Sequence, residues 1–248
     1  MKQNETKHEL TIPPGFWWNA QGPWVEPINI RRGGESGVQR LELGSGVYYV
    51  KRQTNHLYRS LRYPLGRPTL HREWRNLQVC KRLGVATPTV VCFDMRRSDQ
   101  GWEALLVTQA LAGHTSLQAG LESGRWGAQD LERLLGRIVE AILPLHLRRR
   151  KHGHLYPKEI FIRTEGASEE VAFVDLEISR RVASGARAAQ ADMRRLCRSL
   201  QEFGLQESQL QHVAEQYRRH GLHLAIDGLL RPVADSCPAP MLNARVRG

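Results

Sequence analysis

His152-Gly153-His154-Leu155-Tyr156-Pro157-Lys158-Glu159-Ile160-Phe161-Ile162 is a short polar loop that runs into an apolar segment. A second apolar segment, Val171 to Glu177, follows after a few polar residues and carries Asp175. Two such segments at this separation are typical of a β-hairpin, so we expect two adjacent strands. The pairing would place His154, Glu159 and Asp175 where one pocket can use all three side chains.

The composition is that of a soluble globular protein. The chain has 248 residues, of which 41% are hydrophobic and 25% charged, enough for one domain or two small lobes. Residues 1–7 are polar with no apolar follow-on, so we expect no secretory signal. The longest apolar stretch, Ile138 to Leu147, is interrupted by Glu140 and Pro144 and is too short to span a bilayer. We therefore expect a cytoplasmic protein whose cysteines are reduced.

The chain carries a net charge of +11, from 36 basic and 25 acidic residues. Such a surface attracts nucleic acid, anionic lipid headgroups or phosphorylated sugars. The basic residues are dispersed and no nucleic-acid motif frames them, so we expect no nucleic-acid partner. The cluster Arg148 to Lys151 lies beside the polar loop at residues 152–159, which we call the opening loop. It can hold the protein on an anionic membrane surface or attract a phosphorylated ligand.

The first half of the chain is expected to be mainly strands. Residues 1–24 are polar and rich in tryptophan, and we interpret them as an irregular arm that packs through its aromatic rings. From Pro27 to Arg52 apolar residues alternate between glycine turns, which indicates three antiparallel strands. Two more strands are expected at 89–93 and 104–108. With one helix, these strands would form a first lobe over residues 25–111.

One helix is expected from His71 to Leu83, because its apolar positions recur at helical spacing and Gly84 can cap its end. Glu73 would lie in the first turn, where the helix dipole alone can explain a carboxylate. The preceding segment, His56 to Pro68, is interpreted as a loop. Lys51 ends the third strand. On its own it would be a solvated residue, but its place before this helix makes it a candidate to pair with Glu73 and with phosphate.

Gly33, Gly34 and Gly37 cluster at the first glycine turn. Glycine lets the backbone approach a ligand closely, and free N–H groups there can cradle phosphate. Glycine hairpins are nevertheless structural more often than they bind nucleotide, and this spacing departs from the usual Gly-x-Gly-x-x-Gly pattern. The three glycines are candidate nucleotide-binding residues.

The second half, residues 112–230, is expected to be mainly helical, and residues 231–248 to form a loose tail. Asp130 is expected to cap a helix whose leucines and isoleucines form one stripe. That helix leads into the opening loop. A later helix begins near Asp192, which can be read as a simple N-cap. A last helix is expected from about Glu207 to His220.

Lys51, Glu73, the opening loop and Asp175 occur in the order that protein kinases share. Several stretches also resemble the InaA branch of the lipopolysaccharide kinase family, to which the heptose kinases of lipopolysaccharide core assembly belong. The resemblance runs roughly from Trp17 to Leu200. The stretches that carry it are Arg31-Arg32-Gly33-Gly34, Ser36 to Leu41, Tyr48 to Gln53, Gly66-Arg67-Pro68 with Arg72-Glu73, and Val174 to Glu177.

This resemblance implies a single α+β domain with a protein-kinase-like, two-lobed fold. The implied activity is transfer of the ATP γ-phosphate to a sugar hydroxyl of a lipopolysaccharide core intermediate, at the cytoplasmic face of the inner membrane of a Gram-negative bacterium. Matching residues imply that Lys51 holds the ATP phosphates, that Glu73 orients Lys51, and that Asp175 binds Mg²⁺. Asp192 resembles the aspartate that braces the catalytic loop of kinases.

The opening loop departs from the kinase pattern at two positions. His154 stands where kinases carry a catalytic aspartate, and Glu159 where they carry a metal-binding asparagine. A neutral histidine can orient or deprotonate the acceptor hydroxyl, and Glu159 offers oxygen ligands that Mg²⁺ accepts. With Glu177, three carboxylates would lie near the site. An alternative hypothesis is a pseudokinase that binds ATP or nothing and acts as a regulator or scaffold in a stress response.

Overall fold

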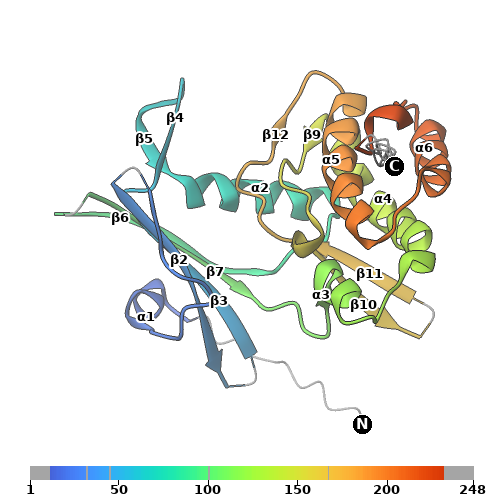
Figure 1. Cartoon of the computed structure of the whole chain (residues 1–248). Coiled ribbons are helices and arrows are strands. Elements are labelled where there is room, and N and C mark those ends of the chain that lie inside the picture. The colour runs from blue at the N-terminus through green and yellow to red at the C-terminus, as the bar shows by residue number, and fades with distance from the viewer. Residues whose placement is uncertain (1–11, 32, 45, 100, 167, 232–248) are drawn as a thin grey trace, which may run out of the picture.

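The structure is a computed structural model that describes residues 12–31, 33–44, 46–99, 101–166 and 168–231 (Figure 1). An antiparallel sheet and one long helix, α2 (Thr69–Leu83), dominate the N-terminal lobe. The C-terminal lobe is mainly helical. This arrangement confirms the predicted α+β, two-lobed, kinase-like fold.

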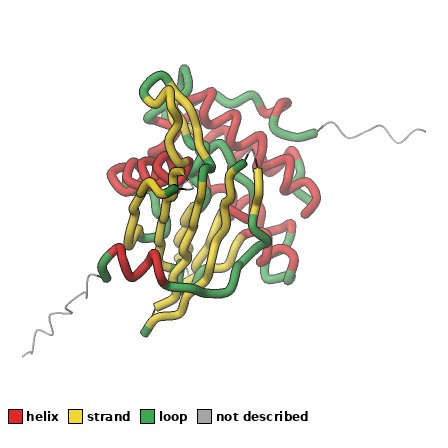
Figure 2. The backbone as a smooth tube through the Cα atoms, turned by 90° about the vertical axis from the view of Figure 1, so that its left-hand side faces the viewer, coloured by secondary structure: helices red, strands yellow, loops and turns green. Residues whose placement is uncertain are grey.

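The sheet of the N-terminal lobe has the strand order β1-β2-β3-β7-β6, and every neighbouring pair is antiparallel. Figure 2 shows this sheet in front, with the helices of the C-terminal lobe behind it. All five predicted strands are present. They are β1 (Asn29–Arg31), β2 (Gly34–Leu43), β3 (Gly46–Thr54), β6 (Val90–Ser98) and β7 (Gly101–Gln109).

The predicted irregular arm contains a short helix, α1 (Pro14–Asn19). Proline suits its first turn, where a missing N–H leaves no hydrogen bond unmade. Trp17 is completely buried in a small core with Val50. The indole Nε1–H of Trp18 donates to Asp94 over 2.8 Å. Residues 1–11 of the arm lie outside the described residues. The described part packs through its tryptophans as predicted, but the interpretation of this part as irregular was wrong, because it contains α1.

Helix α2 begins at Thr69, before the predicted His71, and ends where Gly84 takes a left-handed φ of 70°. Glu73 consequently lies in the second turn. The favourable effect of a helix dipole falls off within the first turn, so the dipole does not account for a carboxylate at this position. The carboxylate of Glu73 must therefore be explained by the residue with which it pairs.

The segment interpreted as a loop is a hairpin of β4 (Leu57–Ser60) and β5 (Tyr63–Pro68). It projects beyond the five-stranded sheet at the top of Figures 1 and 2. The prediction was wrong because tyrosine and arginine carry the strand alternation here, and because Pro64 and Gly66 resemble loop residues. The Tyr58 hydroxyl lies 3.2 Å from Nδ1 of His71 on α2, which anchors the hairpin.

His71 makes folding depend on pH. Burial lowers the pKa of its imidazole to about 4, and the charges of Arg67, Arg75 and Arg62 act in the same direction. An unfolded histidine titrates near pH 6.5, so between these values the unfolded state binds more protons and stability rises with pH. As the pH falls from about 7 to about 5, we expect the titration of His71 to lower the unfolding free energy by about 2 kcal/mol. Urea denaturation at several pH values measures this change.

The variant His71→Phe should lose this part of the pH dependence, because phenylalanine keeps the aromatic packing and binds no proton. The exposed His223 offers a matched control, and His223→Phe should retain the wild-type dependence. Equal pH dependence in wild type and His71→Phe would contradict the prediction.

The described part of the C-terminal lobe contains the α-helices α3 (Leu117–Glu122), α4 (Leu131–Leu147), α5 (Gly185–Leu200) and α6 (Leu210–Arg219). The opening loop runs into the predicted hairpin, β10 (Ile160–Glu165) with β11 (Ser168–Phe173). The remaining short strands are β8 (Thr115–Ser116), which pairs with β10, and β9 (Arg150–Lys151), which pairs with β12 (Arg180–Arg181). Short 3₁₀ turns lie at Ala128–Asp130, Pro157–Glu159, Gln201–Phe203, Glu207–Gln209 and Ile226–Gly228.

The apolar stripe predicted for α4 is buried, and one hydrophobic core joins it to α2, α5 and α6. Asp130 occupies the N-cap position of α4 as predicted, but its side chain does not make the expected capping hydrogen bond. The Asp130 carboxylate accepts from the Gly127 N–H at 3.0 Å and pairs with Arg133 at 2.8 Å, and it makes no cap contact to α4. The shared core holds the two lobes on either side of a cleft.

Three cysteines, Cys80, Cys92 and Cys197, are buried free thiols. Cys237 and the predicted tail from residue 232 lie outside the described residues. Within the part of the chain that the structure describes, no helix is long and apolar enough to cross a membrane.

Candidate active site

A cleft of about 430 Å³ opens between the two lobes. Strands β3 and β7 and helix α2 form one wall, and residues at the ends of β10 and β11 form the other. Of the predicted site residues, Lys51, Glu73, Glu159 and Asp175 line this cleft. The structure therefore brings into one place residues that lie far apart in the chain.

Lys51 and Glu73 form the ion pair that the sequence predicted. The alternation of β3 turns Val50 into the core and Lys51 toward α2, where its Nζ donates to Glu73 Oε1 over 2.5 Å. Burial acts to lower the pKa of the Lys51 ammonium group, but the carboxylates of Glu73 and Asp175 outweigh it and the pKa is raised. Burial raises the pKa of Glu73, against the opposing charge of Lys51. A cationic lysine held at the cleft wall is suited to bind phosphate.

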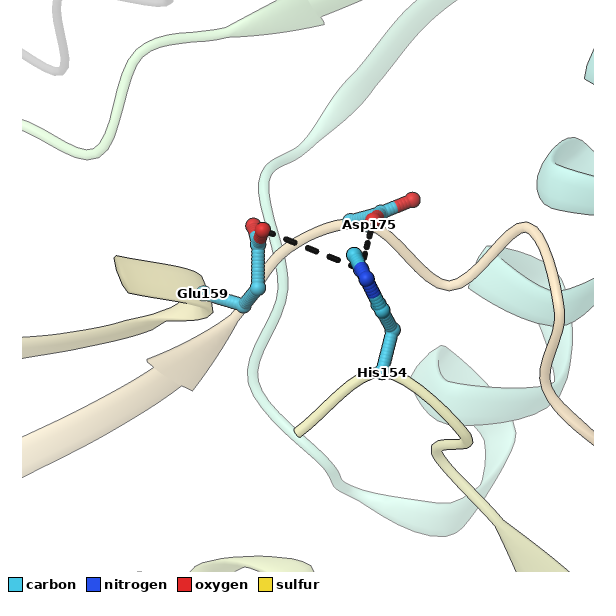
Figure 3. Close-up of side chains that lie close together, drawn as sticks. All are labelled: His154, Glu159 and Asp175. Atoms are coloured by element: carbon cyan, nitrogen blue, oxygen red, sulfur yellow. Dashed lines mark hydrogen bonds and ion pairs between the residues drawn. The ribbon is translucent and has the colours of Figure 1, made fainter. Parts of the chain in front are cut away.

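His154, Glu159 and Asp175 form a compact group, which we call the acid–histidine cluster (Figure 3). One ligand atom from each lies within 4.8 Å of the other two. His154 Nδ1 is 2.5 Å from Asp175 Oδ2 and 3.8 Å from Glu159 Oε1. An ionised carboxylate can only accept hydrogen bonds, so Nδ1–H of the imidazole donates to Asp175.

Backbone contacts fix the two acids of this cluster. Glu159 ends a 3₁₀ turn, and its carbonyl oxygen accepts from the Val174 N–H at 3.0 Å. Asp175 follows with a φ of 56°, in the left-handed region that aspartate enters more readily than most residues. This turn of the chain after β11 aims the Asp175 carboxylate at His154 (Figure 3).

The donor set of the cluster fits the predicted magnesium ligands. Burial raises the pKa of Glu159, and the charge of Asp175 adds to this, while Lys158 and His154 oppose it. A divalent cation beside the two carboxylates would remove their repulsion. Mg²⁺ is commonly held by one or two carboxylates together with substrate phosphates. Asp175 and Glu159 would supply those two carboxylates.

Glu177 does not join the cluster. Its Oε1 accepts from Arg72 of α2 at 3.1 Å. Among the described residues, the group able to hold a metal consists of His154, Glu159 and Asp175. Three carboxylates lie near the site as expected, since the charge of Glu177 also acts to raise the pKa of Lys51 and of Glu73. Glu177 pairs with Arg72, however, and the carboxylates of the metal-holding group are those of Asp175 and Glu159.

Asp192 braces the opening loop from inside the C-terminal lobe. It lies completely buried within α5, whose N-cap is Ser184, so its reading as an N-cap was wrong. Its carboxylate accepts from the His152 N–H at 2.6 Å and the Gly153 N–H at 2.9 Å. His146 Nε2 lies 3.2 Å from the same carboxylate. These contacts fix the backbone directly before His154.

The three candidate glycines are not among the residues that line the cleft. A Cβ on Gly34 would come within 2.6 Å of the Asn55 backbone, and one on Gly37 within 2.5 Å of the Trp24 ring. Packing within the protein therefore explains glycine at both positions. Gly33 has a φ of 74° and closes the turn between β1 and β2. Their contact with nucleotide stays a prediction.

The residues that line the cleft without having been predicted as site residues include His114 and Lys158. His114 lies just before β8, and Lys158 precedes Glu159 in the opening loop. The Nζ of Lys158 is 3.5 Å from Glu159 Oε1. The position of Lys158 next to Glu159 was an available signal, whereas His114 precedes β8, whose pairing with β10 is a contact between segments far apart in the chain.

Comparisons with known proteins agree with this geometry. Residues 16–217 match the model of the lipopolysaccharide kinase (Kdo/WaaP) family. The chain is 38% identical to the protein InaA of Escherichia coli strain K12 over 189 residues, which cover 73% of this chain and 84% of InaA. The structure of WaaP in complex with acyl carrier protein superposes with a TM-score of 0.63 at 20% identity, covering 83% of this chain and 81% of WaaP. The chain belongs to the lipopolysaccharide kinase (Kdo/WaaP) family, in its InaA branch.

Proposed function

We propose that this protein is an ATP-dependent kinase that phosphorylates a sugar hydroxyl of a lipopolysaccharide core or related glycan, at the cytoplasmic face of the inner membrane. Membership of the family supports a lipopolysaccharide-related kinase. The observation that carries the proposal is that the Lys51–Glu73 pair and the two carboxylates of the acid–histidine cluster line the same cleft.

The cleft residues divide into two roles. Lys51, kept cationic and oriented by Glu73, binds the phosphates of ATP. Asp175 and Glu159 would hold Mg²⁺, which would neutralise phosphate charge when bound. Phosphoryl transfer depends mainly on positioning and on charge stabilisation, so these residues provide most of what the reaction needs.

His154 is suited to take the proton of the acceptor hydroxyl. A neutral imidazole has one N–H and one free lone pair. Because Nδ1–H donates to Asp175, the lone pair lies on Nε2. The hydroxyl oxygen bonds to the γ-phosphorus while Nε2 takes its proton, and the bond to the bridging oxygen breaks so that ADP leaves with the electron pair. The carboxylate of Asp175 then stabilises the imidazolium, as an orienting acid does in other histidine bases.

The proposal is tested by measuring ADP release with ATP, Mg²⁺ and a lipopolysaccharide core acceptor. We expect Lys51→Met to lower turnover by about a hundredfold or more, because it removes the cation that holds the phosphates. Lys81→Met is the matched control, since Lys81 is exposed at the end of α2 and does not line the cleft. Equal turnover by wild type and Lys51→Met would overturn the assignment of this cleft.

One contact favours a second candidate function, a pseudokinase acting as a regulator or scaffold in a stress response. The His154 N–H occupies Oδ2 of Asp175 at 2.5 Å, which leaves Oδ1 for a metal, so a metal that needed both oxygens of this carboxylate would compete with the bond to His154. This alternative is preferred if ATP raises the melting temperature of the protein but no phosphate is released or transferred to any core acceptor.

A further inference from the structure

A second hollow, which we call the arginine groove, lies over α2 between the β4–β5 hairpin and the β9–β12 pair. Its volume is about 770 Å³, and it shares no lining residue with the cleft. None of the described residues that line it is acidic. Its arginines are Arg62, Arg72, Arg75, Arg82, Arg150, Arg180 and Arg181.

The charge of this groove is largely uncompensated within the protein. Among the described residues, Arg72 is the one groove arginine that pairs with a carboxylate, that of Glu177. Arg150 is half-buried and donates to the neutral amide oxygen of Asn76 at 2.7 Å. Burial lowers the pKa of Arg150, and the like charges of Arg181 and Arg75 act in the same direction. A bound anion would relieve this repulsion.

The β9–β12 pair places like charges directly opposite one another. Arg180 faces Lys151 in the register, and Arg181 faces Arg150. Cross-strand pairs of equal charge destabilise a sheet, so the protein maintains this arrangement at an energetic cost. The buried Nε of Arg150 also has no hydrogen-bond partner among the described residues. The opposed like charges point to an anionic ligand from outside the chain.

Tyrosines of the hairpin hold two groove arginines in place. The guanidinium carbon of Arg72 lies 5.0 Å from the centre of the Tyr58 ring, and that of Arg62 lies 5.7 Å from the Tyr63 ring. A guanidinium packed against an aromatic ring keeps N–H edges that can bind phosphate oxygens in pairs. The groove is thus built for phosphate groups.

The tip of the same hairpin is apolar. Leu61 is fully exposed and Leu65 is 84% exposed, and no acidic residue occurs between Leu57 and Pro68. Arg59 and Arg62 flank Leu61 in the sequence. The hairpin projects from the body on the side where β9 and β12 lie (Figure 1). A soluble phosphate would bind in the arginine groove and leave Leu61 and Leu65 in water. A lipid bilayer would contact the groove through its headgroups and the two leucines through its apolar layer.

We propose that the arginine groove and this leucine tip together dock the protein on a bilayer that contains anionic phospholipid. The groove arginines bind phosphate headgroups, and Leu61 and Leu65 enter the apolar layer. Docking requires neither ATP nor the cleft. A consequence that rests on the proposed function is that a glycolipid acceptor in the same bilayer would lie beside residues 176–181, next to Asp175.

The test is co-sedimentation of the full chain with vesicles in the absence of ATP. We expect binding to phosphatidylcholine vesicles that contain phosphatidic acid and none to pure phosphatidylcholine. The triple variant Arg75→Gln, Arg180→Gln, Arg181→Gln should lower the partition coefficient by about a hundredfold. The double variant Leu61→Ser, Leu65→Ser should lower it by about tenfold or more. Leu61→Trp should show blue-shifted fluorescence with the anionic vesicles only.

Matched controls separate this surface from general charge and general hydrophobicity. Exposed arginines outside the groove are replaced in Arg137→Gln, Arg187→Gln, Arg219→Gln, and exposed apolar residues outside the tip in Ile30→Ser, Val91→Ser. Both controls should bind anionic vesicles as wild type does. Wild-type binding by the arginine triple variant would overturn the proposal.

Other ligands for the same surface would also overturn it. If inorganic phosphate binds the wild type and not the arginine variant, while anionic vesicles bind neither, the ligand is a soluble phosphate. Salt-sensitive binding to duplex DNA without vesicle binding would assign the groove to nucleic acid. A change in oligomeric state with the leucine variant, measured by sedimentation, would assign the tip to contact between copies. Vesicle binding with no ATP turnover would leave this inference standing and remove only the proposed function.

Discussion

Replacement of Asp175 by asparagine is expected to lower phosphoryl transfer by about a thousandfold. The substitution keeps the size of the side chain and removes its charge. Asp175 accepts the Nδ1–H of His154 at 2.5 Å, and it is one of two carboxylates able to hold a metal in the cluster. The neutral amide would therefore weaken both the metal site and the orientation of the base.

The measurement is single-turnover phosphoryl transfer with ATP and Mg²⁺, together with the melting temperature. Asp227→Asn is the matched control, because Asp227 is an exposed acid in a 3₁₀ turn remote from the cleft residues. Retained transfer in Asp175→Asn would show that the acid–histidine cluster is not the catalytic site. A fall in transfer without a fall in melting temperature places the effect in the chemistry rather than in folding.

The sequence predicted the sheet and the long helices because their patterns are local. Apolar alternation between glycine turns indicated β1 to β3, and the stripe of leucines indicated α4. The β4–β5 hairpin was missed because its inward side chains are tyrosines that surround His71 instead of aliphatic residues. Helix α1 was missed because it is shorter than two turns and depends on burial of Trp17.

Within the site, the order of residues along the chain predicted which ones meet, and the structure brings the Lys51–Glu73 pair together. The direct bond between His154 and Asp175 was not predictable, because it depends on the left-handed φ of Asp175 and on the backbone bond from Val174 to Glu159. The pairing of Glu177 with Arg72 was not predictable for a related reason. Asp175 and Glu177 both follow the end of β11, where the regular alternation of a strand no longer holds. Their separation in the sequence therefore does not determine which side of the cleft each side chain faces.

Replacement of Asp192 by alanine is expected to lower the unfolding free energy by about 3–5 kcal/mol. Three donors would lose their acceptor inside the core, namely the His152 and Gly153 N–H groups and the ring of His146. Burial acts to raise the pKa of Asp192, but the hydrogen bond and charge of His146, with other contacts, outweigh it and the pKa lies below its ordinary value. The stabilisation is thus present above the unfolded pKa of about 4 and is lost as pH falls through the folded value.

Asp192 holds the backbone from which His154 projects, so the same substitution should also reduce phosphoryl transfer at temperatures where the variant is still folded. Tyr217→Phe provides a graded comparison. It removes one hydroxyl, 2.9 Å from His146 Nδ1, and leaves the three contacts to Asp192 in place. We expect it to lower the unfolding free energy by about 1 kcal/mol and to leave transfer unchanged. Urea denaturation and single-turnover transfer are measured on both variants. If Asp192→Ala loses stability but transfers phosphate as well as Tyr217→Phe does, the hydrogen bonds to Asp192 serve folding alone. The position of His154 is then set by Asp175 and Glu159.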